Sequence, residues 1–585
     1  MIPGMTSSVI LQRITRPVTW QRWIGIIFSM MAITLGIAHT WAASTSHSMN
    51  ADGISYLDIG DAYLRGAWKD AINPVWPPLY SWILGLFLRI FQPSMRWEFP
   101  LVHLANFLIY LLAFACFAFF WRQVLIYRQA RHAHGTIALP GWAIQALGYL
   151  LFIWTSLTQI EIWAVTPDML MSASVYLAAA LILRMRMSAQ NWGTHALLGF
   201  VLGLAYLAKT VMLPIGIITL GLSLFSAGGL RRSLPRVLVS LVAFILVAGP
   251  FIALISLAKG RFTYGESGTI TFVRYVNGVS YPHWQGDPPG SGIPAHPSRK
   301  IFNDPPIYEF AEPIGGTYPI TYDPSYWYEG VQPRFTLREQ TQAMLSNALV
   351  YYDVFIRDLG PVLAGLIILY LVATWRAMPA ITGVRKWGLA ILAVLALLLY
   401  ALVFVEGRYI GVFVVLLFAD LLANLSLPEM RPYPRLASAT STLMIVFLLG
   451  NLVAYNLEGF SALVSKPNRQ QEPTQAAAPP GWPGEVAEEL FNLGVAPGDG
   501  VGVIGYAFDS FWARLARVKI VAEMFEWEAG PFYLGSPAFQ SEVIQAFAGT
   551  GARAIVAEHV PEYARMEGWH QVGNSNYYVY RIVQP

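Results

Sequence analysis

Long apolar runs recur along most of this chain and limit what it can fold into. A helix needs on the order of 20 apolar residues to cross the hydrocarbon core of a bilayer. We find about eleven runs that approach this length, near residues 23–43, 100–121, 138–157, 163–183, 194–208, 211–226, 237–258, 356–375, 387–405, 409–427 and 437–458. Only 12% of the residues are charged, against about 25% in ordinary globular proteins. The sequence therefore predicts a polytopic α-helical membrane protein whose main partner is the lipid bilayer.

The first run, the cysteine content and the net charge exclude several other classes. The first run is long and is followed by further runs, so we interpret it as a retained transmembrane helix and not as a cleaved signal peptide. The single cysteine, Cys116, lies inside an apolar run, which excludes disulfides and a cysteine-based metal site. The net charge of +4 gives no argument for a nucleic-acid partner, because the basic residues fall in short loops.

Basic residues flank alternate runs and predict the orientation of the chain. They precede the first run and follow the second, fourth, sixth, eighth and tenth: Arg13, Arg16 and Arg22; Arg122, Arg128 and Arg131; Arg184 and Arg186; Arg231, Arg232 and Arg236; Arg376, Arg385 and Lys386; Arg431 and Arg435. With about eleven spans all six groups are cytoplasmic, as the positive-inside rule requires. Merging the two short runs beside Lys209 into one span would put the three later groups outside. We predict the eleven-span topology in a bacterial inner membrane, with the site and the C-terminal domain facing the periplasm or the cell exterior.

This topology divides the chain into three parts. Residues 1–458 form the membrane domain, with external loops at 44–98 and 259–345; residues 459–483 form a linker biased toward Pro, Gln and Ala. Residues 484–585 have the pattern of a small soluble α/β domain. Its expected helices are 484–493 and 537–547, and its expected strands are 501–505, 518–522, 554–557 and 576–582. The glycine-rich segment 498–505 lacks the order of a dinucleotide site and is assigned a turn role only.

The external loops contain two expected helices and many aromatic residues. Residues 77–91 are apolar, open with Pro77-Pro78 and predict a helix lying along the membrane interface; residues 58–68 predict a second one. Loop 259–345 is rich in Tyr and Trp, whose flat faces can stack on sugar rings or build an ordinary small core. We favour the core for most of them.

Charged residues from distant segments converge on the external face in this topology. They are Asp52, Asp58, Asp61, Glu161, Asp168, Lys209, Glu406 and Arg408. Carboxylates beside hydrocarbon are expensive and are usually kept for a function. Sugar transfer from a lipid phosphate needs a base for the acceptor hydroxyl and cations for the leaving phosphate. Asp52 is the best candidate for the base, because it follows the first span closely in a flexible Asp-Gly context and partial burial would raise its pKa.

Each remaining candidate also has a purely structural explanation. Asp58 and Asp61 could share one helix face, and for Asp61 we favour a solvated helix surface. Asp168 could cap a helix, line the site, or do both. Lys209 could bind a phosphate or form an ion pair with Asp168 or Glu161. Arg408 could bind phosphate oxygens or pair with Glu406.

The order of several short motifs resembles the GT-C superfamily of integral-membrane glycosyltransferases. The motifs are Asp52-Gly-x-x-Tyr56, Trp76-Pro-Pro-Leu-Tyr80, Pro167-Asp168, Ala208-Lys209 and Glu406-Gly-Arg408-Tyr409. The chain is most similar to the branch that holds protein O-mannosyltransferases, lipid A aminoarabinose transferases and RgtA/B/C/D-like bacterial proteins. The similarity covers about residues 20–430 and leaves the C-terminal domain outside.

The resemblance implies a polyprenyl-phosphate sugar donor, a glycolipid, polysaccharide or protein acceptor, and inversion at the anomeric carbon. It implies catalytic roles for Asp52 and Asp168, and substrate contacts from Tyr56, Asp58, Lys209, Glu406, Arg408 and Tyr409. Two departures leave the acceptor and any divalent-cation cofactor open. Val75-Trp76 stand where aminoarabinose transferases have Glu-Lys, and Asp52-Gly53 stand where mannosyltransferases have Asp-Glu.

Two other classes fit part of the sequence. A transporter or lipid flippase would also have many spans and intramembrane charges, but it would predict inverted repeats with broken helices near the midplane. We find no internal repeat, and the charges gather at one face. A non-catalytic envelope-assembly protein would use the C-terminal domain to bind a partner, and it would tolerate Asn at positions 52 and 168. We rank the transferase above both.

Overall fold

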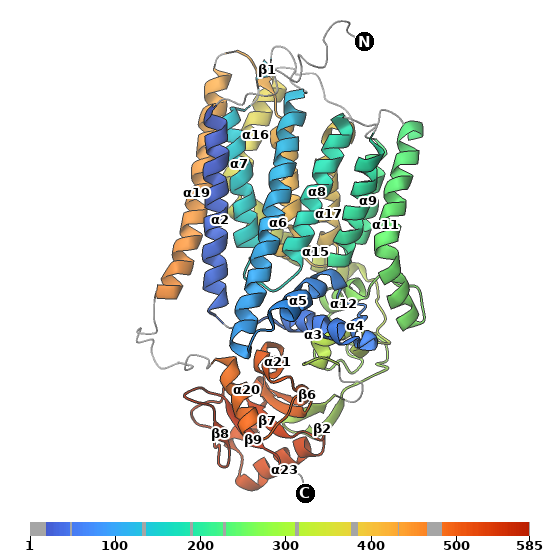
Figure 1. Ribbon diagram of the computed structural model, residues 1–585, viewed down its shortest axis with the longest axis vertical. Helices are drawn as coiled ribbons and strands as arrows, with labels where there is room; N and C mark the ends of the chain where they lie inside the picture. Colours follow the sequence, from blue (N-terminus) through green and yellow to red (C-terminus); the bar gives the residue numbers. More distant parts are fainter. Residues whose placement is uncertain are drawn as a thin grey trace.

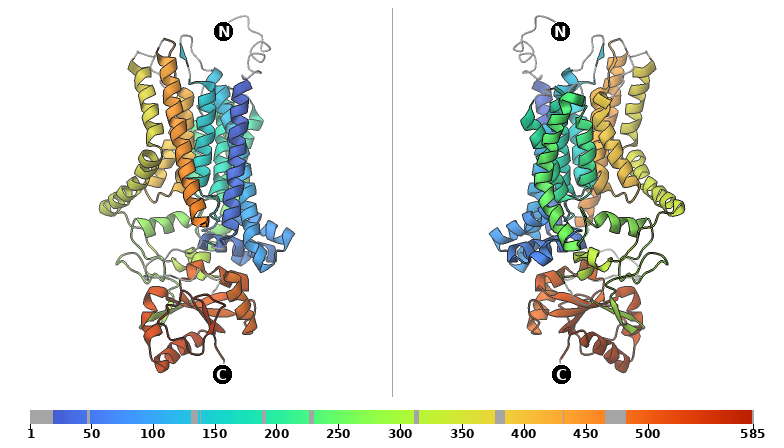
Figure 2. Two further views of the ribbon diagram at one scale, coloured as in Figure 1. Left: turned by 90° about the vertical axis from the view of Figure 1, so that its left-hand side faces the viewer. Right: turned by 90° about the vertical axis from the view of Figure 1, so that its right-hand side faces the viewer.

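The long helices of the chain run side by side in one bundle, and a smaller domain lies at one end of it (Figures 1 and 2). The computed structural model describes residues 19–46, 49–130, 136–137, 139–187, 191–225, 230–310, 315–375, 384–430, 432–464 and 482–583. Most of the predicted linker, residues 465–481, lies outside this range, as do Arg13, Arg16, Arg131, Arg376 and Arg431.

Each predicted apolar run forms a helix. The bundle helices are α2 (Thr19–Ser44), α6 (Met95–Ala130), α7 (Gly141–Trp154) continued by the π-helix η1 (Thr155–Gln159), α8 (Asp168–Met187), α9 (Trp192–Ala208), α10 (Met212–Ser223), α11 (Leu230–Lys259), α16 (Gly360–Trp375), α17 (Val384–Ala401), α18 (Gly407–Asn424) and α19 (Tyr433–Val464). In the described part of the chain, six helices are long and apolar enough to cross a membrane. The number becomes seven if α15 (Leu337–Tyr352), η2 (Asp353–Asp358) and α16 form one bent span.

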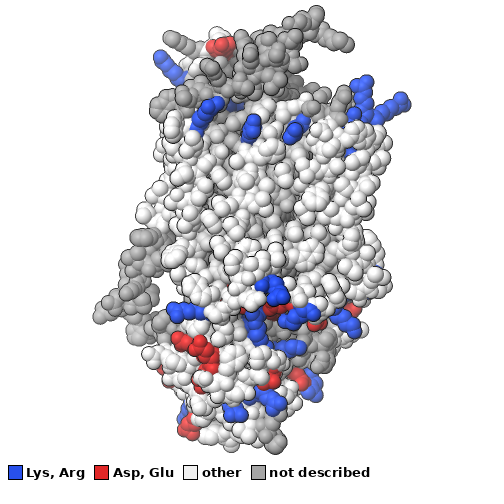
Figure 3. Space-filling model, viewed as in Figure 1, with Lys and Arg blue, Asp and Glu red and all other residues white. Residues whose placement is uncertain are grey.

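The prediction of a polytopic α-helical membrane protein is therefore confirmed. The count of eleven spans stays a prediction, because α9, α10 and α17 are shorter apolar helices. The surface has the corresponding pattern: a broad band with few charged side chains separates a basic end from an end that carries both signs of charge (Figure 3). Such a band is what a bilayer requires of the protein surface that it covers.

Short helices lie between the bundle and the C-terminal domain (Figure 1). They include α3 (Ala51–Arg65), α4 (Trp68–Ala71), α5 (Pro78–Phe91) and α12 (Ser267–Tyr275). The predicted helix 77–91 is α5, which has Pro78 in its first turn, where a missing N–H costs nothing. The other helix, predicted over residues 58–68, is α3, and it begins seven residues earlier than expected, at Ala51. Asp52 is consequently a residue of the first helical turn, where its charge interacts favourably with the helix dipole.

The C-terminal domain is built on a seven-stranded sheet in the order β2-β3-β6-β5-β7-β9-β8. Six of its elements match the prediction: α20 (Pro483–Asn492), β5 (Gly500–Gly505), β6 (Lys519–Phe525), α23 (Pro537–Ala548), β7 (Ala554–Ala557) and β9 (Tyr578–Arg581). β5 pairs in parallel with both β6 and β7. The domain also contains α21 (Phe511–Ala516), α22 (Gly530–Leu534) and β8 (His570–Gln571).

Loop 259–345 supplies the first two strands of this sheet. β2 (Arg299–Asn303) pairs with β3 (Pro306–Glu309), and β3 pairs with β6 through Tyr308 opposite Glu523. Several loop aromatics are buried in the same region, among them Trp284, Tyr318, Tyr322, Trp327 and Tyr328. The core interpretation is confirmed for these five residues, whereas Tyr264 and Tyr275 are exposed. The loop and the C-terminal domain thus share one folded unit.

Candidate functional site

Asn50 fixes the start of α3 against the segment that leads into α8. Its side-chain amide donates to the Val165 carbonyl at 3.2 Å and accepts from the Val165 N–H at 3.1 Å. This pair of hydrogen bonds satisfies a backbone donor and a backbone acceptor that no helix satisfies. Because Asp52 lies two residues after Asn50 and Asp168 three residues after Val165, the two carboxylates are brought to the same place.

Gly53 is required by this close approach. A Cβ atom at position 53 would lie 2.8 Å from the Val165 Cβ and 2.7 Å from the Met49 Sδ. The backbone there is helical and buried. The expectation of a flexible Asp-Gly context is therefore wrong: the glycine lets α3 pack tightly, and Asp52 projects from an ordered helix.

Asp168 and Lys209 form a buried ion pair. Asp168 is the first residue of α8 and is fully buried. Lys209 lies at the break between α9 and α10, and its Nζ contacts the Asp168 Oδ1. Of the two roles open for Lys209, the ion pair is present, and the same Nζ also lies 3.5 Å from the centre of the Tyr409 ring. A cation held over an aromatic face in a desolvated site is stabilised further.

Arg408 connects the remaining carboxylates. It is the second residue of α18, and Glu406 immediately precedes that helix. Its Nε lies 3.0 Å from the Glu406 Oε2, and its Nη1 lies 3.5 Å from the Asp52 Oδ2 and 3.8 Å from the Asp168 Oδ2. The predicted pair with Glu406 is thus present. The two longer contacts leave guanidinium N–H groups that can still donate to another acceptor.

Asp52 is the most accessible carboxylate of this group apart from Glu406. Its side chain is 35% exposed, whereas that of Asp168 is 1% exposed. Partial burial raises the pKa of Asp52 above its usual value; Arg408 lowers it, and the neighbouring charges of Asp168 and Glu406 raise it. A carboxylate with a raised pKa that solvent can reach has the properties of a general base.

Tyr56 lies one turn after Asp52 on α3 and is buried. Its ring packs edge-on against Trp76 and Tyr80, with ring centres 5.1 and 5.0 Å apart. The Tyr80 hydroxyl donates to the Asn106 Oδ1 at 2.6 Å. These contacts join the Trp-Pro-Pro-Leu-Tyr motif to α3, so Tyr56 supports the helix that presents Asp52.

Five predicted residues thus meet at one point, which we name the Asp52 cluster: Asp52, Asp168, Lys209, Glu406 and Arg408. Tyr409 borders it through Lys209. Gly407 explains how α18 reaches it, since a Cβ atom there would lie 2.5 Å from the Gln159 Oε1 of η1. Glu161, which has a left-handed backbone with φ 58°, lies near enough for the charges of Glu406 and Arg408 to affect its pKa, which burial raises.

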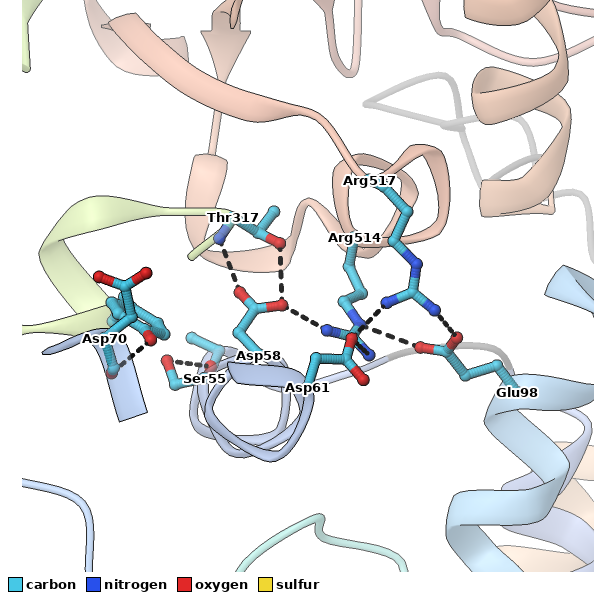
Figure 4. A network of polar contacts seen from close by, with 10 residues as sticks. Ser55, Asp58, Asp61, Asp70, Glu98, Thr317, Arg514 and Arg517 are labelled. Atoms are coloured by element: carbon cyan, nitrogen blue, oxygen red, sulfur yellow. Dashed lines mark hydrogen bonds and ion pairs between the residues drawn. The ribbon is translucent and has the colours of Figure 1, made fainter. Parts of the chain in front are cut away.

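Asp58 lies in a different network, which Figure 4 shows. Its Oδ1 lies 2.5 Å from the Arg514 Nη1, and its Oδ2 accepts from the Thr317 N–H at 2.6 Å. Arg514 also pairs with Asp61 at 2.7 Å and with Glu98 at 3.0 Å. The structure therefore does not bring Asp58 into the Asp52 cluster.

Arg517 completes this second network, which we name the interdomain cluster: Asp58, Asp61, Glu98, Arg514 and Arg517. Arg517 lies 2.8 Å from the Asp61 Oδ2 and 2.6 Å from the Glu98 Oε2. The expectation of a solvated surface for Asp61 is wrong, because two arginines of the C-terminal domain pair with it. Sequence reasoning missed Glu98, Arg514 and Arg517, and only the proximity of their charges in three dimensions identifies them.

The carboxylates of the candidate site have cations as neighbours. Among the described residues, no group of three or more His, Cys, Asp or Glu could hold a metal ion. The carboxylates of the Asp52 cluster already have Lys209 and Arg408 as counter-ions.

Comparison with known proteins finds similarity in structure only. No family model matches the chain, and no curated protein matches its sequence. Among solved structures, the chain is similar to ArnT from Cupriavidus metallidurans bound to undecaprenyl phosphate, with 13% identity and a TM-score of 0.47 over 95% of this chain and 97% of that one.

It is also similar to the Archaeoglobus fulgidus oligosaccharyltransferase in complex with Zn and sulfate, with 12% identity and a TM-score of 0.46 over 92% of this chain and 68% of that one. The same archaeal enzyme, AglB, in complex with an inhibitory peptide and a dolichol-phosphate is similar at 10% identity and a TM-score of 0.38. At such identities and TM-scores, no substrate and no residue role carries over from them to this chain.

Proposed function

We propose that the protein transfers a sugar from a polyprenyl-phosphate donor to an acceptor hydroxyl at the extracytoplasmic face of a bacterial inner membrane. One observation carries the proposal: an accessible carboxylate, Asp52, lies beside two cations, Lys209 and Arg408, where the bundle meets the C-terminal domain. This junction is expected at the membrane surface, where the phosphate groups of lipids lie. The basic end of the bundle, opposite the C-terminal domain (Figure 3), supports the orientation.

The residues of the Asp52 cluster can divide the chemistry between them. The Asp52 carboxylate takes the proton of the acceptor hydroxyl while that oxygen attacks the anomeric carbon. The bond between the anomeric carbon and the phosphate oxygen breaks, and polyprenyl phosphate leaves with the bonding electrons. Arg408 and Lys209 stabilise the charge that develops on the phosphate. Attack opposite the leaving group inverts the anomeric configuration.

Asp168 positions the cations in this proposal. It is buried, pairs with Lys209 and lies within 3.8 Å of Arg408. A buried charge of this kind keeps both side chains in place before substrate arrives. Asp168 is therefore expected to be essential for holding Lys209 and Arg408, and no proton transfer is assigned to it.

Purified protein in detergent tests the function when it is given radiolabelled polyprenyl-phosphate sugars and a membrane extract as acceptor. We expect Asp52→Asn to lower transfer by about 10²- to 10⁴-fold, the usual contribution of a general base, with a thermal unfolding midpoint no lower than that of the wild type. Asp70→Asn is the matched control, because Asp70 is exposed on the nearby helix α4. Equal transfer by wild type and Asp52→Asn would refute Asp52 as the base. Binding of lipid without any transfer to an acceptor would favour a transporter.

A further inference from the structure

Aromatic rings lead away from the Asp52 cluster along loop 259–345. The Tyr409 ring, which lies under Lys209, packs edge-on against Phe404 with 6.0 Å between ring centres. Phe404 stacks on Tyr275, the last residue of α12, at 3.8 Å. α12 is held beside Lys209, because the Thr210 and Ser267 hydroxyls share a hydrogen bond of 2.5 Å.

The row continues into the C-terminal domain. The Arg274 guanidinium lies over Tyr275 and over Tyr281, 4.9 and 4.1 Å from the ring centres. Tyr281 packs on Phe508 at 5.4 Å. Phe508 packs on Tyr506 at 5.1 Å, and Tyr506 lies 6.3 Å from Trp527. We name Tyr275, Tyr281, Tyr506, Phe508 and Trp527 the aromatic row.

Three strands of the sheet end at this row. Tyr506 follows β5, Trp527 follows β6 by two residues, and His559 follows β7 by two residues. These strands are mutually parallel, so their carboxyl ends lie at one edge of the sheet. In open α/β sheets the carboxyl ends of parallel strands are where ligands bind.

Polar groups accompany the rings at this edge. Asp509, Glu526 and His559 all reach solvent there. They lie close enough to affect one another: partial burial of the carboxyl group raises the pKa of Asp509, the charge of His559 lowers it and that of Glu526 raises it. At the other end of the row, burial and then the charge of Asp52 raise the pKa of Tyr281. Ring contacts join the row to the Asp52 cluster, since Tyr275 stacks on Phe404 and Phe404 packs against Tyr409.

This combination of groups fits a carbohydrate better than a peptide. Trp527 and Tyr275 are 60% and 39% exposed, Tyr281 and Tyr506 are partly exposed, and the buried Phe508 packs beneath them. Accessible aromatic rings can bury the apolar faces of sugar rings, and nearby carboxylates accept hydrogen bonds from sugar hydroxyls. An extended peptide would need a free strand edge. β6, β5 and β7 are interior strands of the sheet, paired on both sides, so their backbone offers no such edge at the row.

We propose that the aromatic row binds the acceptor, a glycan several sugar residues long whose terminal hydroxyl reaches Asp52. The proposal rests on the proposed sugar transfer and specifies its acceptor. Trp527, at the outer end of the row and 60% exposed, binds a sugar distant from the reacting one. Short acceptors would not reach it, whereas longer ones would.

A binding experiment without donor tests this independently of turnover. Full-length protein in detergent is titrated with glucose- and N-acetylglucosamine-based oligosaccharides of one to six residues, followed by tryptophan fluorescence and saturation-transfer NMR. We expect affinity to rise with length, and Trp527→Ala to weaken binding of the longer members roughly 3- to 10-fold without affecting monosaccharides. Trp68→Ala is the matched control, since Trp68 is 62% exposed and lies on α4, where its ring packs against Tyr63.

A transfer assay with the acceptor extract split into a lipid fraction and an aqueous polysaccharide fraction then identifies the source of the glycan. Trp527→Ala should raise the acceptor KM in one of the two fractions and leave donor binding unchanged. Absence of length-dependent binding, or label recovered in protein alone, would overturn the glycan proposal while the transferase stands. Length-dependent binding that Trp527→Ala weakens, in a protein that transfers no sugar, would refute the transferase and leave the binding site.

Discussion

Two charged clusters lie along the same helix, α3, and have the same formal composition. The Asp52 cluster and the interdomain cluster each contain three carboxylates and two cations. In the interdomain cluster the five ion pairs measure 2.5–3.0 Å. In the Asp52 cluster, Lys209 contacts Asp168 directly and Arg408 lies 3.0 Å from Glu406, but Arg408 stands 3.5 Å from Asp52 and 3.8 Å from Asp168.

Accessibility separates the clusters in the same way. The three carboxylates of the interdomain cluster are at most 17% exposed, and the Arg514 side chain is 2% exposed. Asp52 is twice as accessible as the most open of them, at 35%. A buried cluster in which every charge has a close partner holds two parts of a protein in one arrangement. A cluster with longer contacts and solvent access retains hydrogen-bond donors and acceptors that can bind a substrate. The distinction comes from pairing geometry and not from residue type.

Among the substitutions that test this difference between the clusters, Arg514→Ala is expected to have the largest effect on the free energy of unfolding. It leaves Asp58, Asp61 and Glu98 without their shared buried cation, and breaking a buried pair typically costs about 3–5 kcal/mol. We expect a lower thermal unfolding midpoint and earlier proteolytic release of the C-terminal domain. Arg517→Ala is the matched control on the adjacent turn: its side chain is 41% exposed, so its loss should cost below about 1 kcal/mol. Equal destabilisation by the two variants would contradict the proposed role of Arg514.

The division into helices and strands could be predicted from the sequence because it depends on local pattern. Apolar runs of sufficient length form helices wherever they occur in a bilayer, and the short apolar segments 501–505 and 554–557, predicted as buried strands, match β5 and β7. The convergence of Asp52, Asp168, Lys209 and Arg408 followed from topology alone, since alternate loops of a helical bundle meet at one end.

The pairings between distant segments could not be predicted. Arg514 contacts Asp58 and Glu98 across 456 and 416 residues, and no local pattern specifies such a partner. The pairing of β3 with β6 could not be predicted for the same reason: the sequence of a strand shows its two-residue period but not the strand that pairs with it. The length of α3 was underestimated because Asp52-Gly53 was interpreted as a flexible loop, while the glycine serves tight packing against Val165.

A smaller change in stability but a large loss of activity is expected from Arg408→Gln. The contacts of Arg408 with Asp52 and Asp168, at 3.5 and 3.8 Å, are longer than those of Arg514 with its carboxylates, so the loss of Arg408 should cost less stability than the loss of Arg514. Its loss removes a donor that stabilises the leaving phosphate, which typically costs about 10²- to 10³-fold in rate. Single-turnover transfer from the labelled donor measures this, with Arg65→Gln as control because Arg65 is exposed in the last turn of α3. Unfolding comparable to that of Arg514→Ala would contradict the distinction between the clusters.

The pH dependence of transfer is the smallest and most specific test. Asp52 must be ionised to act as a base, and its pKa lies above the ordinary value of 3.8. The rate should therefore fall about tenfold per pH unit below that raised pKa. Arg408 lowers this pKa and Glu406 raises it, so Arg408→Gln should move the acidic limb to higher pH and Glu406→Gln to lower pH.

Asp52→Asn should abolish the fall in transfer rate at acidic pH, and an unchanged fall would exclude Asp52 as its origin. Acid unfolding caused by the titration of Asp52 would not produce the same pH dependence of the transfer rate. A carboxyl group with a raised pKa in the folded state binds more protons there than in the unfolded chain, so its contribution to stability increases as pH falls through that pKa. Activity should therefore decline on the acid side over a range where the titration of Asp52 makes the fold more stable.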